Sequence, residues 1–155
     1  ERDIALQFAA MLPSHVRTMA TAERPIEIRP VDLRNPLAPR AHAPARKLWY
    51  RAVDTLPDDP ALHRYLLAYA SDFSFLGTAL DPHGVSWLTP GMQVASLDHA
   101  MWFHRPFRVD EWLLYAVESP SAAGGRGLVR GQFFDRQGRL VASAMQEGLI
   151  RKRPG

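Results

Sequence analysis

One segment of this chain is suited to form a long helix, and almost everything after it is suited to form strands. The segment is PDDPALHRYLLAYASDFSFLGTAL, residues 57–80. Asp58 or Asp59 can cap its start, and Pro60 suits its first turn. Its apolar residues follow the i, i+3, i+4, i+7 spacing of a buried stripe, so we expect other structure to wrap around this helix. The predicted stripe comprises Leu62, Tyr65, Leu66, Tyr69, Ala70 and Phe73.

The sequence from Gln93 onward has the character of β-structure. We predict strands over about 93–105, 112–121, 127–134 and 139–151, with turns at SAAGGRG and at DRQG. Two strands are expected before the helix, in IEIRPVDL (26–33) and RKLWYRAVDTL (46–56), and a helix in IALQFAAML (4–12). This order, with the last four strands in a meander, favours an α+β fold: an antiparallel sheet curled around one helix.

Composition excludes several classes of function. The chain has 155 residues, enough for one domain or one domain plus an arm, and no cysteine. Disulfides, thiolate metal sites and a cysteine nucleophile are therefore excluded. The net charge of +3 is too small for a nucleic-acid interface, and no apolar run reaches the ~20 residues of a membrane span. The mild basic excess favours a solvated surface, with attraction to a phosphate-bearing ligand as the alternative.

Polar chemistry is concentrated in ASLDHAMWFHRPF, residues 95–107. If this is one strand with a period of two, His99 and His104 point to opposite faces, so no metal site and no activation of Ser96 by histidine is expected. We expect both histidines to be structural or surface residues. By the same period Ser96, Asp98, Ala100, Trp102 and His104 share one face, and Leu97, His99, Met101 and Phe103 share the other.

Two further polar residues stand in apolar surroundings. Asp72 lies among aromatic and small residues, where it could cap the helix, face water or serve as a general base. Gln146, on the last predicted strand, is an amide that can both donate and accept hydrogen bonds, but taken alone it indicates no function. No GxSxG nucleophile motif is present.

Taken together, four segments resemble a known family. They are YASDFSFLGTALDPHG (69–84), GMQVASLDHAMWFHRPF (91–107), EWLLYAVES (111–119) and GQFFDRQGRLVASAMQEGLIR (131–151). Their order and spacing resemble the C-terminal half of acyl-CoA thioesterase II, the TesB-type enzymes, over roughly residues 25–153. The resemblance implies a hotdog fold, in which a sheet wraps a central helix. Residues 1–24 would then be an interdomain linker or arm, and residues 25–155 the C-terminal hotdog domain.

The resemblance also implies an activity. Such enzymes hydrolyse acyl-CoA thioesters to fatty acid and CoA without cofactor or metal. Their acid, hydroxyl and amide positions fall on Asp72, Ser96 and Gln146, which would hold and activate one water. Asp98 becomes a candidate hydrogen-bond partner of Ser96 or a structural residue. Candidates for the phosphates and the acyl chain are Arg105, Arg108, Arg126 and Arg130, and Phe73, Phe75, Trp102 and Met101.

Further expectations concern partners and alternatives. We expect an acyl-CoA substrate, pairing with an N-terminal hotdog half and a homo-oligomer, and no nucleic-acid or membrane partner. The end RPG lacks a peroxisomal SKL signal, which favours a cytoplasmic location. The alternatives are a hotdog-type enoyl-CoA hydratase or dehydratase and a non-catalytic acyl-CoA-binding module.

Overall fold

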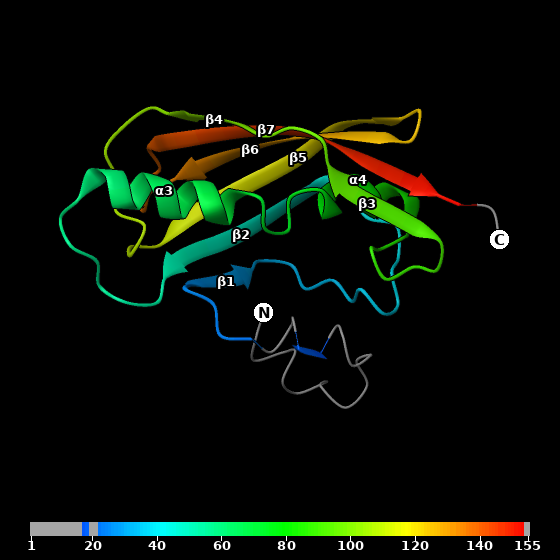
Figure 1. The fold of residues 1–155 in the computed structure, drawn as a ribbon, viewed down its shortest axis with the longest axis horizontal. Coiled ribbons are helices and arrows are strands. Elements are labelled where there is room, and N and C mark those ends of the chain that lie inside the picture. The colour runs from blue at the N-terminus through cyan, green and yellow to red at the C-terminus, as the bar shows by residue number, and fades with distance from the viewer. Residues whose placement is uncertain (1–16, 19–21, 154–155) are drawn as a thin grey trace.

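A curved antiparallel sheet forms most of the molecule (Figure 1). The structure, a computed structural model, describes residues 17–18 and 22–153, so the predicted helix 4–12 and most of the predicted linker lie outside the described residues. The elements are β1 (Ile26–Pro30), β2 (Ala45–Ala52), α3 (Pro60–Ser71), α4 (Gly77–Leu80), the 3-10 turn η2 (Asp81–His83), β3 (Met92–Ser96), β4 (Ala100–Phe103), β5 (Leu113–Ala123), β6 (Arg126–Phe134) and β7 (Leu140–Lys152).

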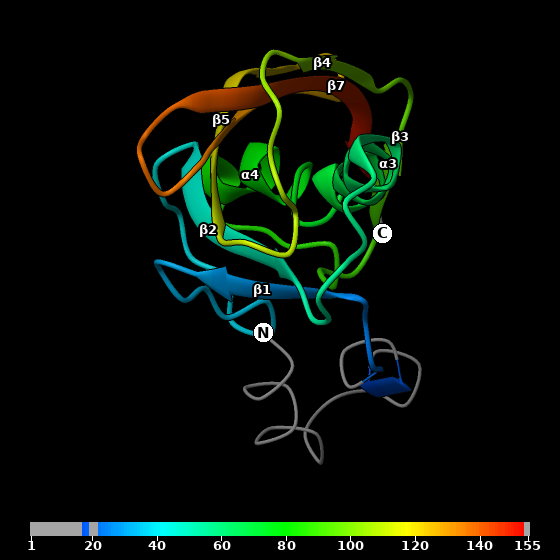
Figure 2. The same ribbon diagram turned by 90° about the vertical axis from the view of Figure 1, so that its left-hand side faces the viewer.

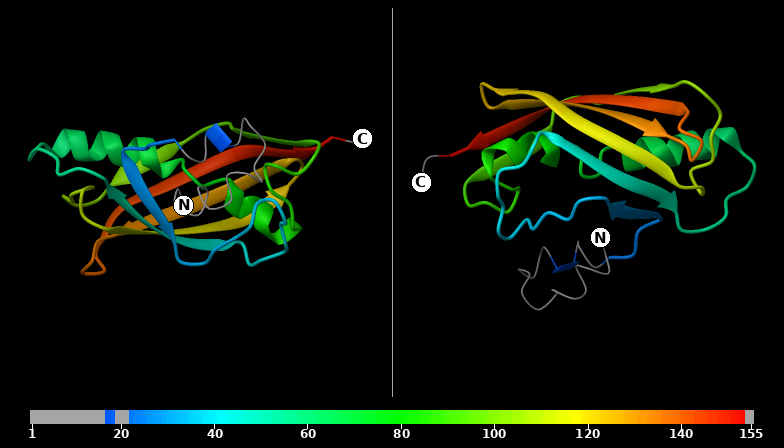
Figure 3. Two further views of the ribbon diagram at one scale, coloured as in Figure 1. Left: turned by 90° about the horizontal axis from the view of Figure 1, so that it is seen from below. Right: turned by 180° about the vertical axis from the view of Figure 1, so that it is seen from behind.

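The seven strands run in the order β1-β2-β5-β6-β7-β3, and β4 also pairs with β7. The sheet curls around α4 and one side of α3, as the end view shows (Figure 2). Seen from behind, β2, β5, β6 and β7 lie side by side (Figure 3). The expected α+β hotdog architecture is therefore what the chain adopts.

Alternation of buried and exposed side chains explains why these segments are strands. Along β5 and β6 every second residue is buried over most of the length, as expected for a sheet with one face on a core. Aromatic rings fill the concave side. The Tyr115 ring stacks on Phe133 with centroids 3.8 Å apart, and both lie close to Tyr50. These rings form the floor against which the helical segment packs.

The prediction of one helix over residues 57–80 is wrong at its C-terminal half. The helix begins as expected, because the Asp59 carboxylate accepts from the Ala61 N–H at 2.9 Å and Pro60 occupies the first turn. It ends at Ser71, and the chain turns through Ser74, whose φ of 61° is left-handed. Two carbonyls freed at this break accept from tyrosine hydroxyls of the sheet, Ser71 from Tyr115 and Phe73 from Tyr50.

The predicted buried stripe is also displaced. The buried residues of α3 are His63, Leu67, Ala70 and Ser71, whereas Tyr65 and Tyr69 are 72% and 54% exposed. The helix lies at the margin of the curved sheet, so only one side of it is covered (Figure 2). The rings of Tyr65 and Tyr69 made the exposed side of the helix resemble a core face in the sequence.

The predicted meander holds only for the last three strands. Strands β5, β6 and β7 are consecutive neighbours, and their turns carry the expected positive-φ glycines, including Gly138. The segment 93–105 instead forms two strands, β3 and β4, which both pair with β7, while β5 pairs with β2. The connection 104–112 therefore runs from β4, which pairs with β7, to β5, which lies between β2 and β6.

Gly131 gives a direct test of this packing. A Cβ at Gly131 would lie 2.3 Å from a ring carbon of Tyr115, whose hydroxyl holds the Ser71 carbonyl. We expect Gly131→Ala to displace the ring and lower the free energy of unfolding by about 1–3 kcal/mol. Gln132→Ala, on the exposed face of the same strand, should change it by less than about 0.5 kcal/mol. Equal melting temperatures for the two variants in calorimetry would contradict this.

Candidate active site

Asp72 and Ser96 lie next to each other although they are far apart in sequence. Asp72 caps the C-terminal end of α3, and Ser96 is the last residue of β3. The Ser96 hydroxyl donates to Asp72 Oδ1 at 3.3 Å. Both residues are exposed, and both line one open cavity of about 1380 Å³. The predicted acid and hydroxyl are therefore in contact at a cavity wall.

Gln146 lies on the concave side of the sheet near this pair. Its strand, β7, pairs with β3 so that Ser96 stands opposite Gly148, two residues away on the same face. A Cβ at Gly148 would strike Leu76, which shows that this face points toward the helical segment. The Gln146 side chain is fully buried.

His99 connects the glutamine to the helix. Its Nδ1 lies 3.0 Å from Gln146 Oε1, and its Nε2 lies 2.8 Å from the Ser71 hydroxyl, one residue before Asp72. The edge of its ring meets Phe75, with centroids 5.9 Å apart. The chain Gln146–His99–Ser71 thus links β7 to the end of α3 beside the Asp72–Ser96 pair.

The assignment of faces along residues 93–105 is wrong, because one extra residue separates β3 from β4. Ser96 pairs with Gly148 but Ala100 pairs with Met145, so the register on β7 slips by one. Continued back by one residue, the β4 register sets His99 opposite Gln146. Ser96 and His99 therefore lie on the same, concave side of the sheet, although both are exposed, while Trp102 lies on the outer face. A uniform period of two could not reveal this.

Asp98 holds the slip in place. Its Oδ1 accepts from the Glu147 N–H at 2.7 Å, and the Glu147 carbonyl accepts from the N–H groups of Leu97 and Asp98. The carboxylate replaces a strand–strand bond that the extra residue removes. Of the two roles considered for Asp98, the structural one fits these contacts.

Tyr115 supports the site electrostatically and sterically. Burial raises the pKa of its hydroxyl well above the usual 10.0, and Tyr50 and Asp72 raise this pKa further. The hydroxyl therefore stays protonated and donates to the Ser71 carbonyl at 3.0 Å. This bond fixes the end of α3, from which Asp72 projects.

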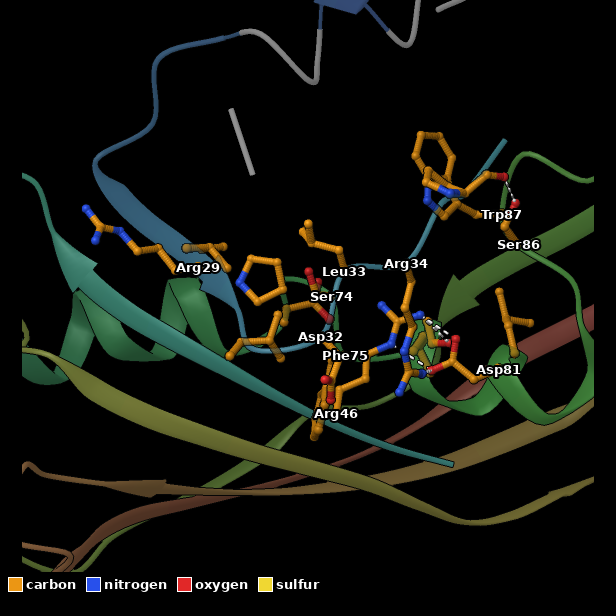
Figure 4. Close-up of a pocket in the computed structure, with 18 of the residues that line it drawn as sticks. Arg29, Asp32, Leu33, Arg34, Arg46, Ser74, Phe75, Asp81, Ser86 and Trp87 are labelled. Carbon is orange, nitrogen blue, oxygen red and sulfur yellow. Dashed lines mark hydrogen bonds and ion pairs between the residues drawn. The ribbon is translucent and has the colours of Figure 1, made fainter. Parts of the chain in front are cut away.

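A basic cluster lies in the same cavity (Figure 4). Arg34 and Arg46 both donate to the carboxylate of Asp81, whose side chain is buried, and Arg34 also donates to the Ala45 carbonyl. Burial lowers the pKa of Arg34, the charge of Asp81 raises it and that of Arg46 lowers it, and the net direction is downward. Two guanidinium groups share one carboxylate, so the cluster has a net positive charge.

The arginines considered for phosphate binding have partners inside the protein. Arg108, Arg126 and Arg130 form ion pairs with Asp110, Glu147 and Glu118, at 2.9, 2.9 and 2.5 Å. Arg105 donates to the Leu140 carbonyl at 2.6 Å. Of the predicted acyl-chain contacts, Phe75 lines the cavity, and Phe73 and Met101 are partly buried against the core.

Two absences hold for the described part of the chain. Within residues 17–18 and 22–153, no group of three or more His, Asp or Glu side chains is arranged to hold a metal ion. No helix in the same ranges is long and apolar enough to span a bilayer.

Comparison with known proteins decides the family. Residues 15–149 match the family model described as acyl-CoA thioesterase. The chain belongs to the acyl-CoA thioesterase family. It is 43% identical over 152 residues to acyl-CoA thioesterase 2 of Haemophilus influenzae, covering 97% of this chain and 53% of that protein. It is 44% identical to human acyl-coenzyme A thioesterase 8, covering 92% of this chain and 44% of the relative.

A solved member of the family supports the fold as well. The crystal structure of acyl-CoA thioesterase II TesB2 from Mycobacterium marinum superposes with a TM-score of 0.69 at 48% identity, over 84% of this chain and 50% of that one. The resemblance to TesB-type enzymes is thus confirmed. The chain spans about half the length of the curated relatives that it matches.

Proposed function

We propose that the protein hydrolyses acyl-CoA thioesters to a fatty acid and CoA, and that this chain supplies Asp72, Ser96 and Gln146 to the reaction site. The observation that carries the proposal is the Ser96–Asp72 contact on a cavity wall. Gln146 is buried on β7, two residues from Gly148, the pairing partner of Ser96. An acid, a hydroxyl and an amide are the groups needed to hold and deprotonate one water. Family membership supports the same chemistry.

The reaction follows from the chemistry of a thioester. Asp72, as general base, takes a proton from a water that Ser96 and Gln146 hold in place. The water oxygen bonds to the thioester carbonyl carbon and forms a tetrahedral intermediate. Its collapse breaks the carbon–sulfur bond and releases a fatty acid, and the leaving thiolate of CoA takes up a proton. No covalent intermediate with the protein is needed, because a thioester is already an activated acyl group.

Basic and acidic side chains both line the cavity of Asp72 and Ser96, and the basic ones are of the kind that binds phosphate. The cavity wall includes Arg40 and Lys47 in addition to the Arg34–Arg46–Asp81 cluster. Basic side chains and a general base on the wall of one cavity fit a substrate with a phosphate-bearing carrier and a reactive thioester. We place the CoA portion of the substrate in this cavity.

The contacts of Asp98 and His99 disfavour the hydratase alternative. Moving a proton and a water across a double bond would use a paired acid and histidine. Here the Asp98 carboxylate accepts from the Glu147 N–H, and His99 contacts Gln146 and Ser71. The two side chains therefore have different hydrogen-bond partners.

A single assay separates the candidate functions. The full-length protein is mixed with a panel of saturated and enoyl-CoA esters, and free thiol and enoyl absorbance are followed in parallel. We expect stoichiometric thiol release from saturated esters. Loss of enoyl absorbance without thiol would favour a hydratase. Ligand binding without any turnover would favour a binding module.

We also propose that this chain acts beside the other half of a double-hotdog protein and within a homo-oligomer. Its match to only about half of each curated relative supports the first part, and the exposed side chains of Asp72 and Ser96 leave one side of the site to be covered. Light scattering of the full-length protein should give a mass above that of one chain. A stable monomer would contradict the oligomer.

A further inference from the structure

We infer that His99 is a positioning residue: its Nδ1–H holds Oε1 of Gln146, so that the Gln146 NH₂ group is turned away from the ring and left to donate to an oxygen of the reacting water or thioester. The inference rests on the proposed function, in which Gln146 contacts the reacting groups. It assigns to Gln146 the role of a hydrogen-bond donor at the site.

The contacts of Ser71 determine where the protons of His99 lie. The Ser71 hydroxyl has one hydrogen and two possible recipients at 2.8 Å, the Ala68 carbonyl and His99 Nε2. If it donates to Nε2, the neutral ring must carry its hydrogen on Nδ1. If it donates to Ala68, Nε2–H donates to Ser71, and Nδ1 of the neutral ring can only accept, which would require the Gln146 amide to present its NH₂ group to the ring. Only the first arrangement fits a neutral ring that faces Oε1 of Gln146, and in it Nδ1–H donates to Gln146 Oε1.

The NH₂ end of the Gln146 amide lacks a partner within the described protein, and a ligand atom could supply one. Gln146 Nε2 is buried and has no hydrogen-bond partner among the described residues. A buried donor left without a partner is destabilising, because it has lost its hydrogen bonds to water. An oxygen of the substrate or the attacking water would remove that destabilisation, and the strongest such acceptor is one on which negative charge develops during the reaction. The donor that is unpaired in the free protein would then form its hydrogen bond in the transition state and stabilise it.

The ring itself is held from three sides. Ser71 of α3 contacts Nε2, Gln146 of β7 contacts Nδ1, and the Phe75 ring packs against its edge. The register slip between β3 and β4 sets the backbone of His99 opposite Gln146. The amide is therefore oriented by a side chain that is itself fixed.

Two substitutions of His99 separate its two nitrogens. Asparagine carries its amide nitrogen near the position of Nδ1, and glutamine carries its own near Nε2. We expect His99→Asn to keep the donor to Gln146 and to retain kcat within about threefold, whereas His99→Gln keeps only the Ser71 side and loses about 10- to 100-fold in kcat with KM little changed. Both are measured in the full-length protein with one acyl-CoA, with melting temperatures as a folding control. Equal loss in both variants overturns the inference.

A double-variant cycle tests whether His99 acts through Gln146. In a Gln146→Ala background the amide is absent, so His99→Gln should cost less than about twofold further. A full further loss would show that His99 acts on the substrate directly and would overturn the positioning role.

A readout that does not depend on turnover keeps this inference separable from the proposed function. In the ¹⁵N-labelled full-length protein, the Gln146 side-chain amide is assigned by its loss in Gln146→Ala. We expect its shift to move in His99→Gln and to remain in place in His99→Asn, and we expect Nδ1 of His99 to be protonated by its ¹⁵N shift. An unprotonated Nδ1 would overturn the inference even if thioester hydrolysis is found. If hydrolysis is absent, these shifts still decide how the amide is held.

Discussion

Asp72→Asn should abolish most thioester hydrolysis while leaving the fold intact. Asparagine keeps an oxygen at the position that accepts the Ser96 hydroxyl, so the local contact survives. It cannot take a proton from water, and positioned base catalysis is typically worth about 10²–10⁴-fold in rate. We therefore expect kcat of the full-length protein to fall by about that factor, with KM and the melting temperature close to those of the unmodified protein.

Asp98→Asn is the matched control for this change. Asp98 is exposed and lies two residues beyond Ser96, but its carboxylate accepts from the Glu147 N–H, a role an amide oxygen can fill. We expect kcat within about threefold of the unmodified protein. If Asp98→Asn lost activity and Asp72→Asn kept it, the general base would be Asp98 and not Asp72, and the proposed site would be refuted.

Asp81→Asn should produce the largest loss of stability among the substitutions considered. The Asp81 side chain is buried and is the shared carboxylate of Arg34 and Arg46. Without its charge, two partly buried guanidinium groups lose the carboxylate that they share. Removing one partner of a buried ion pair typically costs about 3–5 kcal/mol. Urea unfolding of the full-length protein, followed by tryptophan fluorescence, should show a clearly lower midpoint.

An exposed ion pair provides the comparison. Arg130 and Glu118 form a salt bridge whose side chains are each 54% exposed. Glu118→Gln removes the same charge from a site that water reaches, where an ion pair contributes about 0–1 kcal/mol. If the two substitutions shifted the urea midpoint equally, the Arg34–Arg46–Asp81 cluster would be no more than a surface feature.

Local sequence patterns were enough to predict much of this fold. The Asp59–Pro60 start of the helix, the Gly138 turn and the three consecutive strands after Leu113 depend on caps, turn residues and alternation within short windows. The end of the helix depends on contacts that no window contains. The hydroxyls of Tyr50 and Tyr115, from two strands, donate hydrogen bonds to the carbonyls freed at the break.

The candidate site divides in the same way. The family motifs were enough to select Asp72, Ser96 and Gln146, and the structure brings the first two into contact. Strict alternation predicts that His99 and His104 point to opposite faces, which favours a structural or surface role for each. The slip that sets His99 on the concave side depends on the pairing with β7 and on the Asp98–Glu147 bond, both of which join segments about 50 residues apart. A shift of one residue in strand register cannot be predicted from the residue types of the segment.

The number of residues between β3 and β4, which is three, determines which side chains of β4 face the concave side of the sheet. Because side chains alternate along a strand, removing one residue from 97–99 would rotate everything downstream by half a turn, placing Trp102 inside and Met101 outside. Each of the three side chains can be exchanged at a local cost, whereas a single insertion or deletion would exchange the interior for the exterior along a whole strand. The number of residues in this segment should therefore vary less during evolution than their identities.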